Sequence, residues 1–261
     1  MTLSNPYPRL LSKHGRSFYL HPDFARDAAL VGLQHFDDFW GLPAVYVDEI
    51  NERRGGWSAV SQLKIESPQG SALYYVKRQE NQLRRSLSHP FGTLTYHYEL
   101  AAIQRNLRMG LPAVEVVGSG FLSGADFRRG ILITRALKAK PLADLIESKP
   151  DWNTLTPLLQ RTGELLYRMH TNRISHGALY PNHIYFELDP EPDQLQSQPY
   201  LIDFERARRC LTARSAIKRD LSQFLKRAQR IPEQVLENLL DSHLRFHPKL
   251  TTRLMDRFYA R

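Results

Sequence analysis

Two charged side chains in this sequence have the types and spacing needed to bind a phosphorylated ligand. Lys77 follows the apolar run Tyr74–Val76, and a lysine at such a place can neutralise the α- and β-phosphates of a nucleotide. Glu99 falls on the apolar stripe of the next predicted helix, where an acidic side chain is costly unless it meets a cation. The pattern therefore predicts that Glu99 pairs with Lys77.

A second group of polar residues lies about a hundred positions further on. A histidine-led loop reads HGALYPNHIYF over residues 176–186, and Asp203 follows the apolar run Tyr200–Ile202. A carboxylate at the end of such a strand is costly without a cation partner. This order of residues predicts a loop that positions an acceptor hydroxyl and a metal ligand, and a later carboxylate that holds Mg²⁺ against nucleotide phosphates.

A glycine pair, Gly55–Gly56, precedes the first long β-like run. Glycine lets backbone N–H groups approach phosphate oxygens closely, so the pair is a candidate phosphate-binding turn. An ordinary hairpin turn explains the same two residues, and both interpretations stay open.

The elements that must position these residues change character near residue 138. Before it, strands are predicted at 44–50, 57–65, 72–78, 114–121 and 131–137, and a helix at 96–108. Alternation places Trp57, Ala59, Leu63 and Ile65 on one face, and Ser-Pro-Gln-Gly at 67–70 forms a turn. The pattern predicts a short antiparallel meander with the glycine pair at its first turn.

After residue 138 helices dominate. A long helix is predicted to begin at the pair Thr156–Pro157, and further helices at 217–229, 232–244 and 250–259. A loop with two short strands spans 174–206, and its part at 189–199 is expected to be a surface turn. The fold class is therefore α+β, with a strand-rich nucleotide-binding lobe at 1–137, of which 1–40 is an extension, and a helical lobe with the catalytic-type loop at 138–261.

Composition and charge narrow the class of protein. Hydrophobic residues make up 42% and charged residues 24%, which is globular composition, and a single cysteine, Cys210, excludes an intrachain disulfide. We expect no signal peptide and no membrane-spanning helix, and hence a cytoplasmic protein. The net charge of +9 suits a phosphorylated substrate, an anionic membrane or nucleic acid, although solubility alone also explains it. Nucleic acid is not expected, because no recognition motif accompanies the charge.

Taken in order, these elements resemble the protein-kinase-like fold and, within it, the lipopolysaccharide kinase (Kdo/WaaP) family, most closely its InaA-like members. The strings RRGGWSAV, YVKRQEN, HGALYPNHIYF and LIDFERAR carry the resemblance, from about residue 50 to 225. It implies a two-lobe fold with an N-terminal antiparallel sheet lobe and a helical C-terminal lobe. It also implies an activity, the ATP- and Mg²⁺-dependent phosphorylation of a sugar hydroxyl in the lipopolysaccharide inner core or a related acceptor. Peripheral contact with the anionic inner membrane would fit that acceptor.

The resemblance also assigns roles to individual residues. Lys77 would contact the phosphates, with Gly55 and Gly56 near them, and Glu99 would hold Lys77. His176 would support the loop, Asp203 would bind Mg²⁺, and His183 stands where a kinase has its second metal ligand. The adenine hinge would fall at Thr134–Leu137, and Asp220 would brace the loop.

The chain departs from the kinase pattern at Ala178, where the family's proton-accepting aspartate would stand, and at Glu205, which replaces a glycine. A pseudokinase, a nucleotide-binding regulatory module without that aspartate, is therefore the alternative prediction. A membrane or nucleic-acid binder on a kinase-like scaffold rests on charge alone. His243 and His247 have metal-like spacing but no third ligand, and Cys210 has no resolving cysteine, so neither is expected to form a site.

Overall fold

The computed structural model describes residues 15–43, 45–47, 49–53, 55–68, 70–86, 89–148, 151–187 and 199–258. The chain divides into two compact units, which are described separately. The first comprises Met1–Ala101 and Val114–Ala136, and the second Ala102–Ala113 and Leu137–Arg261. The division after Ala136 lies next to the boundary that the sequence suggested, but the segment 102–113, which includes the end of a helix, belongs to the second unit.

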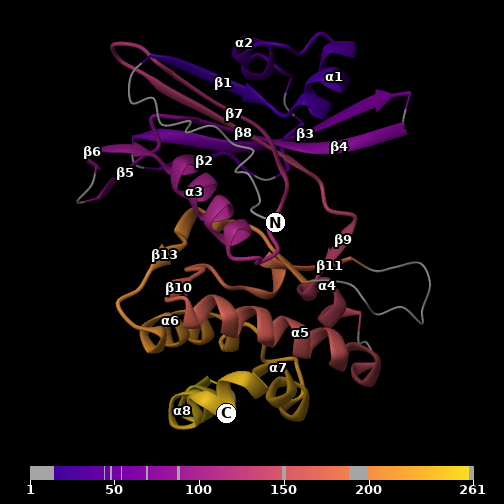
Figure 1. The fold of residues 1–261 in the computed structure, drawn as a ribbon, viewed down its shortest axis with the longest axis vertical. Helices are drawn as coiled ribbons and strands as arrows, with labels where there is room; N and C mark the ends of the chain where they lie inside the picture. The colour runs from indigo at the N-terminus through magenta and orange to yellow at the C-terminus, as the bar shows by residue number, and fades with distance from the viewer. Residues whose placement is uncertain are drawn as a thin grey trace. The chain divides into compact units, whose positions relative to one another are not determined.

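The first unit is built on a six-stranded antiparallel sheet in the order β1-β7-β8-β4-β3-β2 (Figure 1). Its strands are β1 (Arg16–Leu20), β2 (Asn51–Arg53), β3 (Gly56–Ser67), β4 (Gly70–Glu80), β7 (Val116–Ser123) and β8 (Arg128–Arg135). A separate hairpin and three helices complete it: β5 (Leu83–Ser86), β6 (His89–Leu94), α1 (Pro22–Leu30), α2 (Phe36–Trp40) and α3 (Thr95–Arg108), the last of which runs into the second unit. The predicted meander is confirmed, and Ala59 and Ile65 of β3 are buried as expected.

Three strand predictions in this unit were wrong in their bounds. The described part of 44–50 is not a strand, because it pairs with β3 only through an isolated bridge from Tyr46 to Ser61, and β2 begins at Asn51. The strands predicted at 114–121 and 131–137 are β7 and β8, displaced by two or three residues. The displacement of β8 follows from its pairing with β4, which begins at Arg129 opposite Glu80 and ends at Arg135 opposite Tyr74.

The segment predicted as an extension is, from residue 15 on, an integral part of the first unit. Strand β1 pairs along β7, and Phe24, Phe36 and Phe39 are fully buried in one core with Tyr74 of β4. The guanidinium group of Arg78 donates to the carbonyl oxygens of two residues at the end of α2 and just beyond it, Trp40 at 2.8 Å and Leu42 at 2.9 Å. These contacts fix the helices to the sheet.

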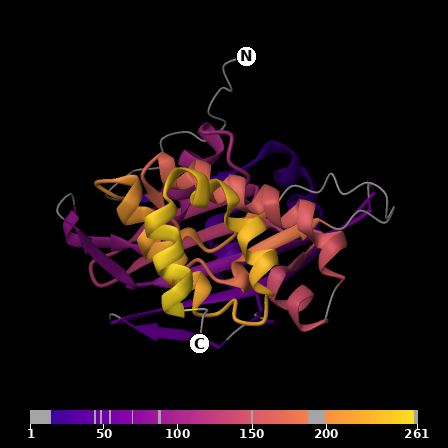
Figure 2. The same ribbon diagram turned by 90° about the horizontal axis from the view of Figure 1, so that it is seen from below.

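The second unit is mainly helical. Its helices are α4 (Leu142–Glu147), α5 (Trp152–Thr171), α6 (Ala213–Leu225), α7 (Glu233–Phe246) and α8 (Pro248–Phe258), with two 3₁₀ turns, η1 (Pro181–His183) and η2 (Phe204–Arg206). Two small antiparallel sheets accompany them, formed by β9 (Ala139–Pro141), β11 (Ile184–Glu187) and β12 (Pro199–Leu201), and by β10 (Ile174–Ser175) and β13 (Arg208–Arg209). Figure 2 shows α7 and α8, in yellow, side by side against the other helices of this unit. No helix in the described ranges is long and apolar enough to cross a bilayer.

The start of α5 differs from the prediction. The helix begins at Trp152, where the Asp151 side chain caps it by accepting from the amide of Asn153 at 3.0 Å, so Thr156–Pro157 lies inside the helix instead of at its start. Further along, α5 meets α7 so closely that a Cβ atom at Gly163 would lie 1.7 Å from the carbonyl oxygen of Leu239. The three helices predicted beyond residue 210 exist, each beginning within four residues of its predicted position. Of the predicted turn at 189–199, all but Pro199 lies outside the described residues.

Candidate active site

Lys77 and Glu99 form an ion pair within the first unit. Lys77 lies in the middle of β4, paired with Val60 of β3 and Leu132 of β8. Its Nζ is 2.7 Å from Oε2 of Glu99 on α3, and the two side chains are only 14% and 11% exposed. The predicted pairing is confirmed, and it places an ammonium group at a defined point on one face of the sheet.

The alternation of β4 explains why this pair forms where it does. Val76 and Arg78 point to the side of the buried core, and Lys77 and Gln79 point to the side on which α3 packs. Gln79 accepts a hydrogen bond from the amide of Tyr96 at 2.9 Å, and its Nε2 donates to Oγ1 of Thr95 at 2.8 Å. Gln79 thereby captures the first turn of α3, one turn before Glu99.

Sequence reasoning missed this anchoring residue. The only available signal was its spacing of two from Lys77, which places both side chains on the same face of a strand. Nothing in the sequence indicated that the partner of Gln79 would be a helix N-terminus, because that contact joins elements that are distant along the chain.

The two glycines of the predicted phosphate turn each have a structural reason. Gly55 has a φ of +76° in the turn between β2 and β3, a conformation that side chains rarely tolerate. A Cβ atom on Gly56 would lie 2.1 Å from the carbonyl oxygen of Glu80, so the end of β4 requires glycine there. Thr134 lies on β8 opposite Tyr75, and Leu137 is the first residue after the division between the units. Their assignments to phosphate and adenine stay predictions.

In the second unit, His176 is a buried support for the backbone beside Asp203. Its ring Nε2 lies 2.9 Å from the carbonyl oxygen of Ile202, so Nε2 carries a proton and donates it. Its Nδ1 accepts from the amide of Ala178 at 3.3 Å. Burial lowers the pKa of His176, which keeps the ring neutral, as these two bonds require. His176 therefore ties the start of the loop to the residue that precedes Asp203.

Asp220 on α6 holds the same loop from the other side. Its fully buried carboxylate accepts from the Ser175 hydroxyl at 2.7 Å, from the amides of His176 and Gly177 at 2.6 and 2.9 Å, and from the His170 ring at 3.1 Å. Burial by itself would raise the pKa of Asp220, but the hydrogen bonds and the positive charge of His170 lower it overall. The expected bracing of the loop by this aspartate is confirmed.

Asp203 and His183 present an oxygen and a nitrogen toward one another. Asp203 has left-handed backbone angles, φ 61° and ψ 62°, and its side chain is 38% exposed. His183 Nδ1 lies 2.8 Å from the carbonyl oxygen of Ala178, which can only accept, so Nδ1 is protonated. In the neutral ring the free lone pair is then on Nε2, which lies 3.8 Å from Oδ2 of Asp203.

Ala178, which stands at the position of the missing aspartate, is buried. Ala178 is 2% exposed, and the loop 175–186, all of which the structure describes, contains no carboxylate. The sequence and the structure therefore agree that the chain lacks the proton acceptor that a kinase holds at this point.

His243, whose spacing from His247 is metal-like, lies at a contact between two helices. His243 is buried with its Nε2 2.9 Å from Nδ1 of His170, a helix-to-helix contact, and the described residues contain no group of three or more potential metal ligands.

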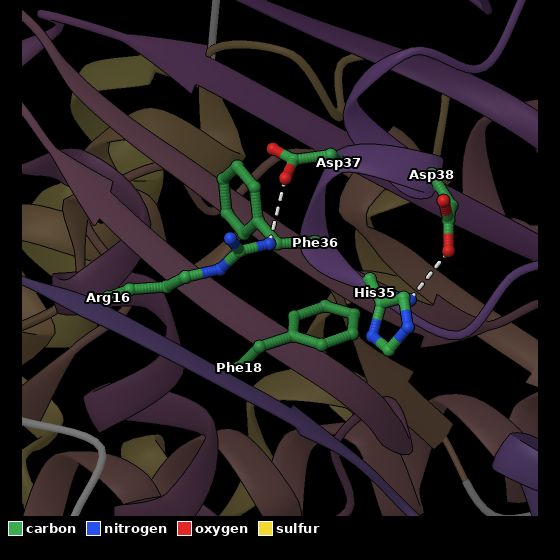
Figure 3. A pocket seen from close by; sticks show the side chains of 6 residues that line it. All are labelled: Arg16, Phe18, His35, Phe36, Asp37 and Asp38. Carbon is green, nitrogen blue, oxygen red and sulfur yellow. Dashed lines mark hydrogen bonds and ion pairs between the residues drawn. The ribbon is translucent and has the colours of Figure 1, made fainter.

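A cavity of about 390 Å³ in the first unit is lined by residues of β1 and of the segment around α2, none of which was predicted as a site (Figure 3): Arg16, Phe18, His35, Phe36, Asp37 and Asp38.

Comparison with solved structures supports the predicted class of fold. WaaP, solved in complex with acyl carrier protein, matches with a TM-score of 0.62 at 19% identity, covering 92% of this chain and 97% of that chain. The likeness confirms the α+β, protein-kinase-like fold with its antiparallel sheet lobe and helical lobe.

The family follows from the sequence comparisons. The model of the lipopolysaccharide kinase (Kdo/WaaP) family matches residues 37–243, and the chain belongs to that family. Protein InaA of Escherichia coli (strain K12) is 27% identical over 209 residues, which are 76% of this chain and 90% of that protein. The predicted resemblance is confirmed.

Proposed function

We propose that this member of the lipopolysaccharide kinase family is a phosphotransferase that uses ATP and Mg²⁺ to phosphorylate a sugar hydroxyl of the lipopolysaccharide inner core or a related acceptor. The observation that carries the proposal is the ion pair between Lys77 and Glu99. It holds an ammonium group at the strand position where a kinase-like protein contacts the phosphates of its nucleotide.

Asp203 is the residue best suited to hold Mg²⁺. Its carboxylate is a hard oxygen donor, it is partly exposed, and Ile202 and the ring of His176 fix its backbone. His183 Nε2 is the second candidate, although Mg²⁺ prefers oxygen to an imidazole nitrogen. When bound, Mg²⁺ would neutralise charge on the phosphates of ATP.

The acceptor proton has no carboxylate to receive it. Loss of a general base typically lowers a rate by about 10²–10⁴-fold. Phosphoryl transfer depends mainly on positioning and electrostatic stabilisation, which Lys77 and Asp203 can supply without a base at position 178. We therefore propose a slow transfer in which the acceptor proton passes to water.

Binding of Mg-ATP tests the proposal directly. Ligand at 100 times its Kd should stabilise the native protein by about 2.7 kcal/mol, which is measured as a rise in Tm. Asp203→Asn should abolish the Mg²⁺-dependent part of this rise. Asp256→Asn, the same change at an exposed carboxylate of α8, should leave the rise intact. A wild-type Tm that does not respond to Mg-ATP would contradict the proposal.

The pseudokinase is the second candidate, and the buried methyl group of Ala178 favours it. Ala178→Asp would restore a proton acceptor and should raise transfer of phosphate to an acceptor by about 10²–10⁴-fold if the remaining site is intact. Ala178→Asn is the matched control, because it adds the same volume without the base. Measurable phosphate transfer by the wild type, at the same rate as by Ala178→Asp, would exclude the pseudokinase.

We also propose that the protein works at the cytoplasmic face of the inner membrane, where anionic head groups attract its net charge of +9. The expected result is co-sedimentation with phosphatidylglycerol vesicles that weakens as salt rises, and none with neutral vesicles. Equal binding to both kinds of vesicle would contradict an electrostatic contact.

A further inference from the structure

Three arginine side chains of the second unit gather beside the His176 loop. Arg206 ends η2, three residues after Asp203, and Arg208 begins β13, which pairs with β10 directly before His176. Arg206 and Arg208 are both exposed and Ala207 between them is buried, so the two arginines lie on the solvent side of this segment. The third, Arg219, lies on α6 next to Asp220.

This group, which we call the arginine cluster, presents positive charge near the surface of the second unit. Arg206 and Arg208 are exposed, and no ion pair joins any of the three guanidinium groups to a carboxylate in the described ranges. The Nε atom of Arg219 is buried and has no hydrogen-bond partner. The neighbouring carboxylate, Asp220, already accepts four hydrogen bonds from the loop and from His170.

The three charges are close enough to act on one another. Burial lowers the pKa of Arg219, and the positive charges of Arg208 and Arg206 lower it further, against the opposing effect of Asp220. An arginine does not give up its proton in a protein, so the cluster stays fully charged. A cluster of like charges with a buried, unpartnered N–H group is stabilised by an anion that accepts hydrogen bonds from it.

The backbone connects the cluster to the loop of the candidate site. Gly177 has a φ of +79°, and a Cβ atom there would lie 2.3 Å from the carbonyl oxygen of Arg206. The chain that carries the arginines is therefore packed directly on the residue after His176. An anion held by the cluster would lie beside the loop that, under the proposed function, receives the acceptor hydroxyl.

We propose that Arg206, Arg208 and Arg219 bind a phosphomonoester group, and hence that the acceptor is a molecule that already carries a phosphate. The role of the bound molecule as an acceptor rests on the proposed function. The anion site itself rests only on the arginine cluster. Guanidinium groups match phosphate oxygens with paired hydrogen bonds. Arg219 is only partly exposed, so it is better matched to a small phosphate than to the plane of a membrane surface, which would contact the exposed Arg206 and Arg208.

The experiment is a calorimetric titration with inorganic phosphate at constant ionic strength set by chloride, and with a hexose phosphate against the same hexose without phosphate. The wild type should bind phosphate and the hexose phosphate but not the free hexose. The double variant Arg206→Gln/Arg208→Gln should bind both at least about tenfold more weakly, as expected for the loss of charge-assisted hydrogen bonds. Arg230→Gln/Arg253→Gln removes the same charge from exposed positions of the second unit and should bind as the wild type does.

Three results would overturn the inference. These are no phosphate binding by the wild type, an equal loss in both double variants, and binding of an adventitious ion only, without preference for phosphate over chloride. Binding to phosphatidylglycerol vesicles that needs Arg206 and Arg208, without binding of either phosphate, would assign the cluster to a membrane instead.

The titration also separates this inference from the proposed function. If Mg-ATP raises the Tm but phosphate does not bind, only the arginine cluster has failed. If phosphate binds through Arg206 and Arg208 but Mg-ATP has no effect, the proposed function and the role of acceptor fail, and the anion site stands.

Discussion

At the scale of single residues, the carboxylate of Glu99 fixes the ammonium group of Lys77, and burial of that carboxylate in turn requires the ammonium group. Glu99 is 8% exposed overall, and a carboxylate removed from water to this extent needs a cation. Lys77 supplies it at 2.7 Å. Each of the two residues therefore destabilises the fold if the other is removed. The pair also orients the Lys77 ammonium group, the charge on the sheet that the proposed function needs.

A double-mutant cycle measures this coupling. Lys77→Met leaves the Glu99 carboxylate buried without its cation and should lower the free energy of unfolding by about 3 kcal/mol. Lys77→Met/Glu99→Gln should be more stable than the sum of the two single variants predicts, because no unpaired charge remains. Urea unfolding provides the energies. Strict additivity would show that the ion pair contributes nothing beyond its separate side chains.

At the scale of elements, the two faces of β4 bind different helices. On one face Arg78 fastens the chain around the end of α2 through two backbone carbonyls, and on the other Gln79 fastens the start of α3. Lys77 lies between them along the strand. The position of Glu99 relative to Lys77 is therefore set by a hydrogen-bond network at the beginning of the helix.

Gln79→Leu should separate this positioning from simple loss of stability. The variant leaves the amide of Tyr96 without its acceptor, at a cost of about 1–3 kcal/mol for an unsatisfied buried group, whereas the Thr95 hydroxyl keeps its bond to Gln82. It should also reduce the Tm rise with Mg-ATP, because α3 no longer holds Glu99 against Lys77. Gln62→Leu, an exposed position of β3, is the control and should change neither. Lower stability with an unchanged Mg-ATP response would contradict a positioning role.

At the scale of the whole molecule, buried histidines make the native state sensitive to acid. Burial, followed by the positive charge of His89, lowers the pKa of His97 to about 4, and burial, followed by His170 and His247, lowers the pKa of His243 to about 2. The unfolded chain takes up these protons near the usual histidine pKa of about 6.5, so it binds more protons than the native state below that pH. The contribution of these neutral histidines to the free energy of unfolding is therefore fully present above about pH 6.5, and it decreases as the pH falls below that value.

The expected loss is up to about 1.4 kcal/mol per pH unit for each such histidine. Urea unfolding at pH 7.5, 6.5, 5.5 and 4.5 measures it. His97→Gln should flatten this dependence between pH 6.5 and 4, whereas Gln62→Leu, a change at an exposed position that removes no histidine, should leave it unchanged. A stability that stays constant down to pH 4.5 would contradict the account.

The sequence by itself determined the residues that carry charge to the candidate site and the elements they belong to. The strand lysine, the helix glutamate and the aspartate after a short strand were readable because each breaks an apolar pattern, and an ion in such a place needs a partner nearby. The antiparallel meander and the helices beyond residue 210 followed from periodicity for the same local reason. The absence of a carboxylate in the loop was also visible, since it needs only the identity of residue 178.

The tertiary structure decided what depends on contacts between distant segments. The incorporation of β1 and α1 into the first unit and the anchoring of α3 by Gln79 join segments that are separated along the chain. The gathering of Arg206, Arg208 and Arg219 depends on the packing of α6 and β13 against β10. The start of α5 at Trp152 was likewise set by a cap that the stronger pattern at Thr156–Pro157 concealed. Periodicity describes which face of an element is buried, but it does not specify which other element covers that face, and the choice of partner is what positions a site.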